Sequence, residues 1–211
     1  KIHEKNYQRT LNEKQILELV NHPNIVKLFY AFQDNNKLYL ILEYLQGGEL
    51  FHHLAMEKFM SEKDSSYYIA QMLLGIRYLH LKLKVIYRDL KPENCLLNSF
   101  GNLVLTDFGL SKIAADNEDG TTKNHSITGT VQYMAPEILQ GDPYDFAVDY
   151  WSLGCVAFDL LTGSLPFTGT NPKKILEKMK SIKKNLKFPF YLSLDAKDFL
   201  RKLLQVNPEK R

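Results

Sequence analysis

Two short apolar runs, each bordered by polar residues, constrain this chain more than any other feature of its sequence. The runs are CLL at residues 95–97 and LVLT at residues 103–106. Because two strands joined by a turn bring their outer ends together, the polar residues that border the runs should meet at one point. Three of these residues precede the first run and one follows the second, and they are Asp89, Lys91, Asn94 and Asp107.

These four residues together supply the groups that the transfer of a phosphoryl group requires. One carboxylate must accept the proton of the attacking hydroxyl, an ammonium must neutralise the moving phosphoryl group, and oxygen ligands must hold Mg²⁺. We assign the first role to Asp89, the second to Lys91 and the third to Asn94 with Asp107. For the Arg88-Asp89 pair taken alone, a solvated turn with a surface ion pair is the alternative.

Composition limits the class of protein. A chain of 211 residues with 45% apolar residues can bury one substantial core or two unequal lobes that share a cleft. Its net charge of +3 is too small to indicate nucleic acid as the main partner. The longest apolar stretch, residues 151–161, is interrupted by Asp159 and falls far short of the roughly 20 residues of a membrane span. We therefore expect no membrane segment.

The two cysteines, Cys95 and Cys155, each lie within an apolar run. Two cysteines cannot form a disulfide framework, and we expect both to be buried, reduced thiols. A single disulfide is the alternative. Reduced thiols are typical of proteins of the cytoplasm or the nucleus, so we expect a cytoplasmic protein, with the nucleus as the second location.

Hydrophobic periodicity divides the chain near the Gly47-Gly48 pair, which we interpret as a hinge or linker. Before this pair, residues 9–20 have the pattern of a helix and residues 24–33 and 37–44 the pattern of two strands. After it, helical patterns predominate. Ser61 is the predicted N-cap of the first of these helices, and Leu73 is among its predicted core residues. The predicted helices span residues 61–80, 148–163, 172–182 and 194–204.

Several motifs, in a fixed order, resemble those of one enzyme family. YRDLKPEN at residues 87–94, DFG at 107–109 and APE at 135–137 resemble the catalytic-loop, Asp-Phe-Gly and Ala-Pro-Glu signatures of eukaryotic protein kinases. The AGC group of serine/threonine kinases, and within it the kinases of ribosomal proteins, is the most similar. The motifs that resemble this group are TLNEKQIL at residues 10–17, LYLILEYLQGGELF at 38–51 and GTVQYMAPEIL at 129–139.

The resemblance implies an α+β fold of two lobes. Residues 1–45 would form a partial small lobe of one helix and strands, and residues 46–211 a mostly helical large lobe. ATP and Mg²⁺ would be the cofactors, and the γ-phosphate would pass to Ser or Thr of a protein. Neither the Gly-rich loop nor the Val-Ala-x-Lys strand of the family is found, so we expect a fragment of a longer enzyme. A pseudokinase or a truncated form that binds a partner is the alternative.

The resemblance also implies which residues surround the nucleotide. Glu13 corresponds to the helix glutamate that pairs with the ATP-binding lysine, and it shares a helix face with Ile16 and Leu17. A solvated or capping glutamate is the alternative. Leu42 is at the gatekeeper position, where the hinge that cradles adenine begins. For residues 42–45 an ordinary buried strand end is the alternative, and both interpretations can hold. The predicted nucleotide contacts are Glu13, Leu42, Glu43, Tyr44, Leu45, Glu49, Leu96 and Thr106.

Three further residues have structural roles in the family. Asp149 resembles the buried aspartate that holds the catalytic loop from beneath, and an acid in so apolar a helix needs hydrogen-bond donors. Glu137 and Arg211 resemble the partners of a structural ion pair.

The resemblance places a phosphorylation site in the activation loop. Ser126 is at this position, and an upstream kinase would phosphorylate it. Arg88 and Lys112 would be the cationic partners of the phosphate, because a phosphate can order a loop by pairing with a basic cluster.

Acidic residues near the catalytic loop resemble those with which basophilic kinases of this group bind arginine. Glu49, Glu93 and Asp159 are the acids concerned, and Thr130 is the fourth predicted substrate contact. We expect substrates with arginines two to five residues before the Ser or Thr. The alternatives are a helix-start acid for Glu49, a solvated loop residue for Glu93 and a local salt bridge for Asp159.

A lysine-rich stretch remains that these roles do not explain. Docking of an acidic partner or of nucleic acid is one interpretation, and the solvated face of a helix is the alternative. The lysines concerned are Lys173, Lys174, Lys178, Lys180, Lys183, Lys184 and Lys187.

Overall fold

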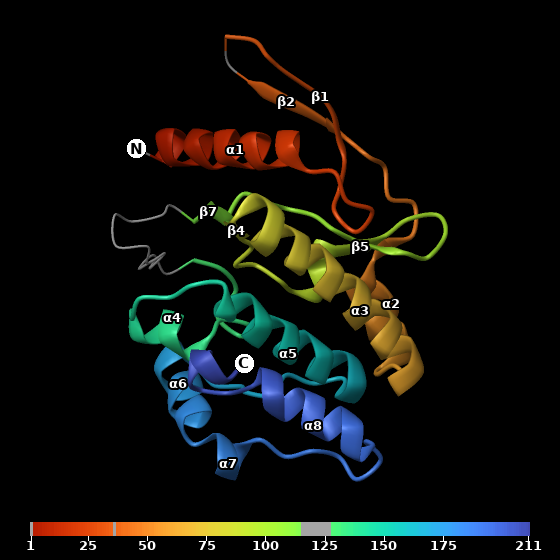
Figure 1. The fold of residues 1–211 in the computed structure, drawn as a ribbon, viewed down its shortest axis with the longest axis vertical. Coiled ribbons are helices and arrows are strands. Elements are labelled where there is room, and N and C mark those ends of the chain that lie inside the picture. The colour runs from red at the N-terminus through yellow and green to blue at the C-terminus, as the bar shows by residue number, and fades with distance from the viewer. Residues whose placement is uncertain (1, 36, 115–127) are drawn as a thin grey trace.

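A hairpin and one helix stand at one end of the molecule, and a group of helices packs around small sheets below them (Figure 1). The computed structural model describes residues 2–35, 37–114 and 128–211. Within these ranges, no helix combines the length and the hydrophobicity that crossing a membrane requires.

The helix α1 (Ile2–Leu19) lies beneath the hairpin formed by β1 (Leu28–Gln33) and β2 (Leu38–Leu42). It begins well before the start that the sequence pattern predicted. Near its end, the side chains of Ile16 and Leu17 are buried. This end of the helix is therefore anchored in the core.

One face of the hairpin is apolar and exposed. In the antiparallel register Tyr30 lies opposite Ile41, so their side chains share this face. Phe32 and Tyr39 are the next pair on it, and their rings stack with centroids 4.9 Å apart. All four side chains are exposed, Tyr30 to 71%. The opposite face includes the half-buried Leu40.

Two small antiparallel sheets bring the termini of short strands together. One has the strand order β3-β5-β6 and the other pairs β4 with β7. Cys95 pairs with Leu105, so the start of β5 lies beside the end of β6, as the two apolar runs predicted. The strands are β3 (Gly48–Glu49), β4 (Val85–Ile86), β5 (Cys95–Leu97), β6 (Leu103–Leu105) and β7 (Lys112–Ile113).

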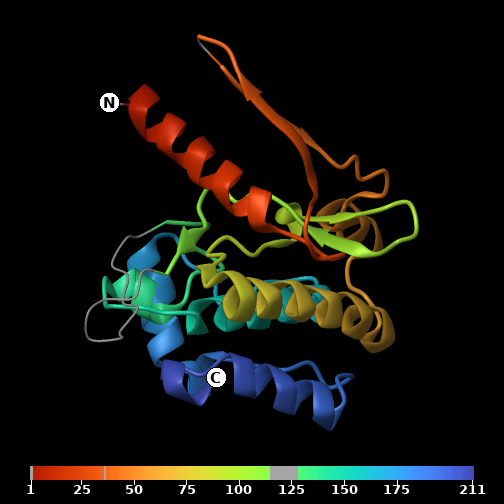
Figure 2. The same ribbon diagram turned by 45° about the horizontal axis from the view of Figure 1, so that its top comes forward.

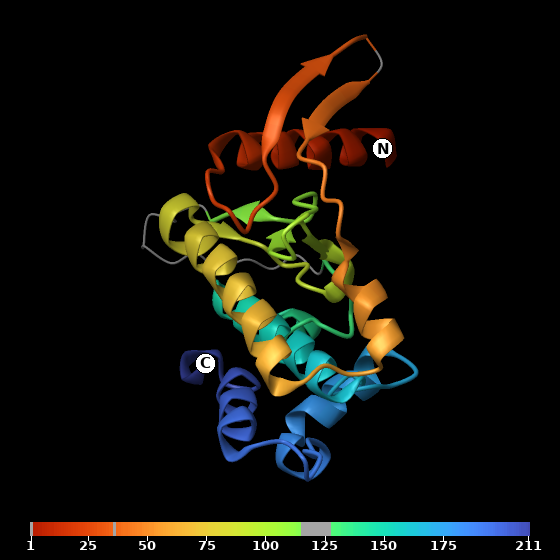
Figure 3. The ribbon, with the colours of Figure 1, turned by 90° about the vertical axis from the view of Figure 1, so that its right-hand side faces the viewer.

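The remaining helices make up most of the molecule. They are α2 (Leu50–Glu57), α3 (Glu62–Tyr78), α4 (Pro136–Gln140), α5 (Ala147–Thr162), α6 (Pro172–Lys180), α7 (Ile182–Asn185) and α8 (Leu194–Leu203), with short helical turns at Leu79–Leu83, Pro92–Asn94 and Pro208–Lys210. Helix α5 packs against α3 on one side and against α8 on another (Figures 2 and 3). It therefore lies at the centre of the helical group.

Helix α5 is buried along most of its length because its residues are apolar on all sides. Every residue from Trp151 to Leu161 is buried, and the Trp151 ring stacks on that of Phe167 with centroids 5.7 Å apart. Cys155 of this helix and Cys95 of β5 are buried and free, as expected. Burial raises the pKa of both thiols, so neither is reactive at neutral pH.

Helix α3 shows both a confirmed and a wrong prediction. The Ser61 side chain accepts a hydrogen bond of 3.1 Å from the Asp64 N–H, so Ser61 is the N-cap as predicted. Ile69 and Met72 are buried. Leu73 was expected in the core but is 37% exposed, because it lies on the flank of the helix that faces the start of α8 across an open cavity.

The helix predicted over residues 172–182 is interrupted at Ser181. The N–H of Ser181 closes α6 by donating to the carbonyl of Glu177. Its own carbonyl accepts hydrogen bonds from the N–H groups of Lys184 and Asn185, which start α7. One residue thus ends one helix and begins the next. Six lysines of the stretch are divided between the two helices, and Lys187 follows α7.

We expect the apolar face of the hairpin to promote self-association, since contiguous exposed apolar side chains favour contacts between molecules. Tyr30→Lys should reduce concentration-dependent association, measured by light scattering. It should change the free energy of unfolding by less than about 0.5 kcal/mol, because the side chain lies largely in water. Gln33→Lys adds the same charge on the opposite face and should leave association unchanged. Equal effects of the two variants would exclude this face as the cause.

Candidate active site

Asp89 lies at the centre of a hydrogen-bonded cluster of side chains. Its Oδ2 is 3.0 Å from the Nζ of Lys91 and accepts a hydrogen bond of 3.0 Å from the Nδ2 of Asn94. Its Oδ1 accepts a hydrogen bond of 3.2 Å from the hydroxyl of Thr130, to which Lys91 also donates at 3.0 Å. Asp89 is only 5% exposed. The cluster therefore holds one carboxylate in a defined orientation.

The loop that carries Asp89 is held from beneath by the carboxylate of Asp149, on α5. The N–H groups of Tyr87 and Arg88 each donate to it at 2.8 Å. The Nε2 of His80 donates to the same carboxylate at 2.7 Å. Asp149 is fully buried, and a buried carboxylate without donors would be strongly destabilising. The three donors explain how an acid can lie within so apolar a helix.

Sequence reasoning did not identify His80. A histidine near the end of an apolar helix has the pattern of an ordinary core residue, and nothing near it in sequence indicates its partner. The structure shows that its ring is buried and packs against Phe146, with ring centroids 4.8 Å apart. The only available signal was the acid in the apolar helix, Asp149, which required donors from elsewhere in the chain.

Two residues of the site have left-handed backbone conformations although neither is glycine. Arg88 has a φ of 68° and Asp107 a φ of 58°. Such conformations cost about 1–3 kcal/mol each, so surrounding contacts must hold them. The side chain of Arg88 donates to the carbonyl of Leu110 at 2.7 Å and to the hydroxyl of Tyr144 at 2.9 Å. These contacts join the catalytic loop to the segment after Asp107 and to the segment between α4 and α5.

The pairing of β5 with β6 brings Asn94 and Asp107 to the same end of the sheet. The Thr106 N–H donates to the carbonyl of Asn94 at 3.0 Å, and Asp107 follows directly. Among the described residues, the side-chain hydrogen bonds of Asn94 use its Nδ2, which leaves Oδ1 as an available oxygen. The carboxylate of Asp107 is exposed, and the Gly109 N–H donates to its Oδ1 at 3.2 Å.

An amide oxygen beside an exposed carboxylate fits the hard oxygen donors that Mg²⁺ prefers. The part of the chain that the structure describes contains no group of three or more His, Cys, Asp or Glu side chains that could hold a metal ion. A Mg²⁺ ion at Asn94 and Asp107 would therefore need further oxygen ligands, which phosphates and water commonly provide.

Glu13 of α1 lies beside the same end of the sheet. Its Oε1 accepts a hydrogen bond of 3.2 Å from the Phe108 N–H. Burial raises the pKa of Glu13, the hydrogen bond from Phe108 lowers it, and the nearby charge of Asp107 raises it. The net shift is upward, so its contribution to stability is lost as the pH rises through the raised pKa. No ion pair of Glu13 occurs among the described residues, and its pairing with a lysine stays a prediction.

The predicted hinge follows β2 along one edge of the molecule. Leu42 is the last residue of β2 and is 37% exposed. The Glu43 N–H donates to the carbonyl of Lys27 at 2.9 Å, which continues the pairing of the hairpin. Tyr44 is exposed and Leu45 is buried. Exposed and buried side chains thus alternate along this segment, as they do at the end of an extended strand. This conformation also allows the segment to bind a nucleotide.

The other predicted nucleotide contacts meet on the three-stranded sheet. Glu49 of β3 lies opposite Leu96 of β5. Thr106 packs behind the loop, since its hydroxyl donates to the carbonyl of Asn94 at 3.1 Å and its own carbonyl accepts a hydrogen bond from the Tyr87 hydroxyl. The structure therefore places Glu49 and Leu96 within the sheet, while Thr106, just after β6, lies beside Asn94, just before β5.

A cavity of about 410 Å³ adjoins the catalytic cluster through Thr130 and is also lined by Glu93 and Asp159. Glu49 does not line it. Asp159 is 8% exposed, and the Tyr133 hydroxyl lies 3.2 Å from its Oδ2 and donates to it. Burial raises the pKa of Asp159, the hydrogen bond from Tyr133 lowers it, and the charge of Glu93 raises it, with an upward net shift. Three of the four predicted substrate residues thus share one cavity.

Arg211 forms a two-pronged ion pair with Glu137 of α4. Its Nη1 is 2.5 Å from Oε1 and its Nη2 2.8 Å from Oε2. Nη1 also donates to the carbonyl of Ala147, the first residue of α5, at 3.1 Å. The guanidinium carbon lies 5.2 Å from the centroid of the Trp151 ring. The pair thus connects α4, α5 and the end of the chain.

The predicted phosphorylation site, Ser126, lies outside the described residues. Of its two predicted cationic partners, Arg88 makes the contacts given above. Lys112 is exposed in β7, where it pairs with Ile86 of β4. Both cations therefore lie near the start of the activation segment.

Gly129 is a second residue of the site that sequence reasoning missed. It has a φ of 116°, and a Cβ atom there would lie only 2.7 Å from the carbonyl oxygen of Arg88. Only glycine allows the backbone to approach the catalytic loop this closely. A glycine beside the predicted contact Thr130 was the available signal.

We expect Gly129→Ala to lower the free energy of unfolding. Backbone strain alone should cost about 1–3 kcal/mol, and the steric clash should add to this cost. Gly101→Ala is the control, since Gly101 has a φ of 77° but a Cβ there would meet nothing within 4 Å. Urea unfolding measures both variants. Equal destabilisation would show that the approach to Arg88 imposes no steric limit.

Comparison with known proteins places this geometry in a family. The protein kinase domain family matches residues 1–211. The chain is 51% identical to serine/threonine-protein kinase YPK3 of Saccharomyces cerevisiae, 48% to ribosomal protein S6 kinase alpha-1 of Homo sapiens and 46% to ribosomal protein S6 kinase beta of Caenorhabditis elegans. These matches cover 98%, 96% and 99% of the chain but only 41%, 27% and 37% of the relatives. The chain belongs to the protein kinase domain family and, within it, to the serine/threonine kinases of AGC type.

Proposed function

We propose that this chain carries the phosphotransfer machinery of an ATP-dependent serine/threonine protein kinase. The observation that supports this most strongly is the cluster around Asp89, in which one buried carboxylate contacts Lys91, Asn94 and Thr130. Asp107, a second acid, follows the neighbouring strand. Few other chemistries require a base, an ammonium and oxygen ligands for a metal ion within one loop pair.

In this proposal the side chains have separate tasks. Asp89 accepts the proton of the substrate hydroxyl, and Lys91, 3.0 Å from it, neutralises the phosphoryl group in transit. Thr130 contacts both and lies where the hydroxyl of the substrate would approach. Asn94 through Oδ1 and Asp107 through its carboxylate would hold Mg²⁺, which would neutralise charge on the phosphates of ATP.

Replacing the two acids should separate these tasks in the full-length protein. Asp89→Asn and Asp107→Asn should each reduce phosphotransfer to a peptide by at least about 10²-fold. Asp89→Asn should keep ATP binding, because this carboxylate contacts the hydroxyl and not the nucleotide. Asp107→Asn should weaken Mg²⁺-dependent ATP binding, measured by calorimetry.

The control for both variants is Asp142→Asn, which removes an exposed acid just after α4. It should change neither the rate of phosphotransfer nor the affinity for ATP. Equal loss of ATP affinity in the Asp89 and Asp107 variants would contradict the assignment of roles.

We also propose that the enzyme selects substrates with arginine before the phosphorylated residue. Glu93 and Asp159 line one cavity beside Thr130, so a substrate held near Thr130 would place upstream residues close to both acids. A guanidinium can pair with two carboxylates through its several N–H groups. Glu49, outside this cavity, would contact a further arginine. Proteins with such sites are the proposed substrates.

Selection of arginine should depend on pH through Asp159. Because the pKa of its carboxyl is raised, acidification from about pH 8 should protonate it earlier than an ordinary aspartate and weaken the ion pair. The ratio of kcat/KM for a peptide with arginine to that for the same peptide with glutamine should therefore decrease as the pH is lowered. Asp159→Asn should lower this ratio about tenfold or more and remove this part of its pH dependence.

Tyr133→Phe serves as the matched control for this measurement. It removes the hydrogen bond that lowers the pKa of Asp159, so the fall in selectivity should shift to higher pH. A selectivity profile that is unchanged in both variants would refute the role of Asp159 while leaving the kinase assignment in place.

Regulation by an upstream kinase at Ser126 is part of the same proposal. A phosphate there would pair with Arg88 and Lys112 and order the segment that contains Thr130. The two buried, reduced cysteines support a cytoplasmic location, with the nucleus as the second one.

A further inference from the structure

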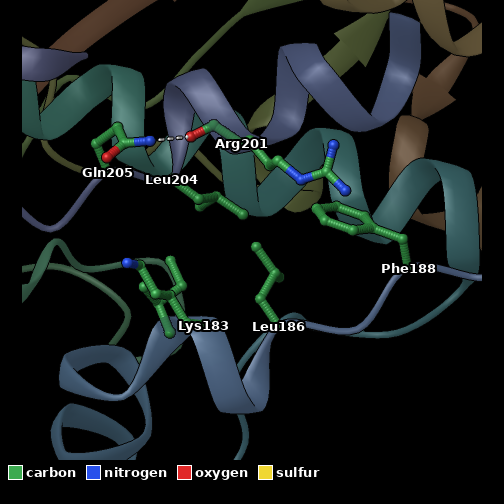
Figure 4. Close-up of a pocket in the computed structure, with 7 residues that line it drawn as sticks. Lys183, Leu186, Phe188, Arg201, Leu204 and Gln205 are labelled. Atoms are coloured by element: carbon green, nitrogen blue, oxygen red, sulfur yellow. Dashed lines mark hydrogen bonds between the residues drawn. The ribbon is translucent and has the colours of Figure 1, made fainter. Parts of the chain in front are cut away.

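A separate cavity of about 390 Å³ lies between α7 and α8, at the end of the molecule opposite the hairpin (Figures 1 and 4). Its walls are apolar. Leu204 is buried, whereas Leu186 and Phe188 are half-buried and contribute to the walls. Figure 4 shows Leu186 and Leu204 pointing toward one another from opposite sides. A volume of this size accepts one or two apolar side chains.

The rim of this cavity carries two cations. Lys183 of α7 and Arg201 of α8 are both exposed and lie at opposite ends of it in Figure 4. The guanidinium carbon of Arg201 is 4.9 Å from the centroid of the Phe188 ring, so the ring holds the charge against the apolar wall. Among the described residues, neither cation takes part in an ion pair, whereas Lys202 pairs with Asp198.

The segment that provides the α7 wall of the cavity is also positively charged. Between residues 171 and 193 the sequence has seven lysines and a single acid, Glu177. Ile175 and Met179 turn one face of α6 into the core, and the lysines are exposed on the other side. The catalytic cluster uses none of these residues. The solvated face expected from the sequence is therefore present, but it adjoins an apolar cavity, which a purely solvated face does not require.

We propose that this cavity, with its cationic rim, binds a short acidic segment of a partner protein. An apolar side chain of the segment inserts between Leu186 and Leu204, and neighbouring carboxylates pair with Lys183 and Arg201. The apolar walls favour this occupant over nucleic acid, because the lysines alone could bind its phosphates and no apolar cavity would be needed. They also favour it over a membrane surface, because the cavity is recessed. The proposal does not depend on phosphotransfer.

The test uses peptides of about 12 residues with a central Phe, flanked either by Asp or by Asn, and binding to the intact protein measured by fluorescence polarisation. The Asp-flanked peptide should bind at least tenfold more tightly than the Asn-flanked one. Replacing the central Phe by Ser should weaken its binding by a similar factor. Binding should fall with added salt.

Two double variants with equal change in charge locate the binding. Lys183→Glu with Arg201→Glu reverses the charge of the rim and should abolish binding of the Asp-flanked peptide. Lys173→Glu with Lys174→Glu reverses two exposed lysines outside the cavity lining and should weaken binding less than about threefold. An unfolding temperature equal to that of the parent protein shows that each variant is folded.

Three outcomes would overturn the proposal. The first is an absence of binding by the Asp-flanked peptide up to millimolar concentration. The second is equal weakening by the two double variants, which would show that the lysines attract anions without a site. The third is binding of a short single-stranded DNA that exceeds that of the peptide and depends equally on both pairs of cations.

Discussion

The buried carboxylate of Asp149 is the interaction on which the rest of the catalytic site depends. It accepts hydrogen bonds from two successive N–H groups, those of Tyr87 and Arg88, and from His80. Breaking a buried, hydrogen-bonded charge of this kind costs about 3–5 kcal/mol, so the loop cannot leave the top of α5 without a large loss of stability. The rigidity of α5, buried along most of its length, is thereby transmitted to the loop that holds Asp89.

Backbone strain is stored directly beside this support. Arg88 has a left-handed conformation immediately before Asp89, and Asp107 has another at the end of β6. Neighbouring contacts fix both conformations. Arg88 lies next to Asp89, which has a proposed chemical role, and Asp107 has such a role itself. The approach of Gly129 to the carbonyl of Arg88 then closes the site from the side of the activation segment. The geometry of the cluster is thus determined by contacts from three distant segments.

The charges of the molecule are separated to an extent that its small net charge conceals. Two acids, Glu93 and Asp159, line the cavity beside the catalytic cluster, and two cations, Lys183 and Arg201, line the cavity between α7 and α8. Two separate cavities of one chain can therefore attract a basic substrate segment and an acidic partner segment. Each proposed occupant would be repelled by the other site, which favours correct docking.

The sequence by itself determined the family, the α+β class and most of the helices, because motif order and apolar periodicity are local properties. It also predicted that Asn94 and Asp107 would meet, since the two apolar runs had to pair as strands. Tertiary structure alone decided that His80 supports Asp149, that Gly129 approaches Arg88, and that Glu13 contacts the Phe108 N–H. In each of these cases the partner is far away in sequence, and only the packing of α1, α3 and α5 around the sheets brings the groups together. The cavity between α7 and α8 arises for the same reason, because Leu186 and Leu204 come from separate elements and have no shared sequence pattern.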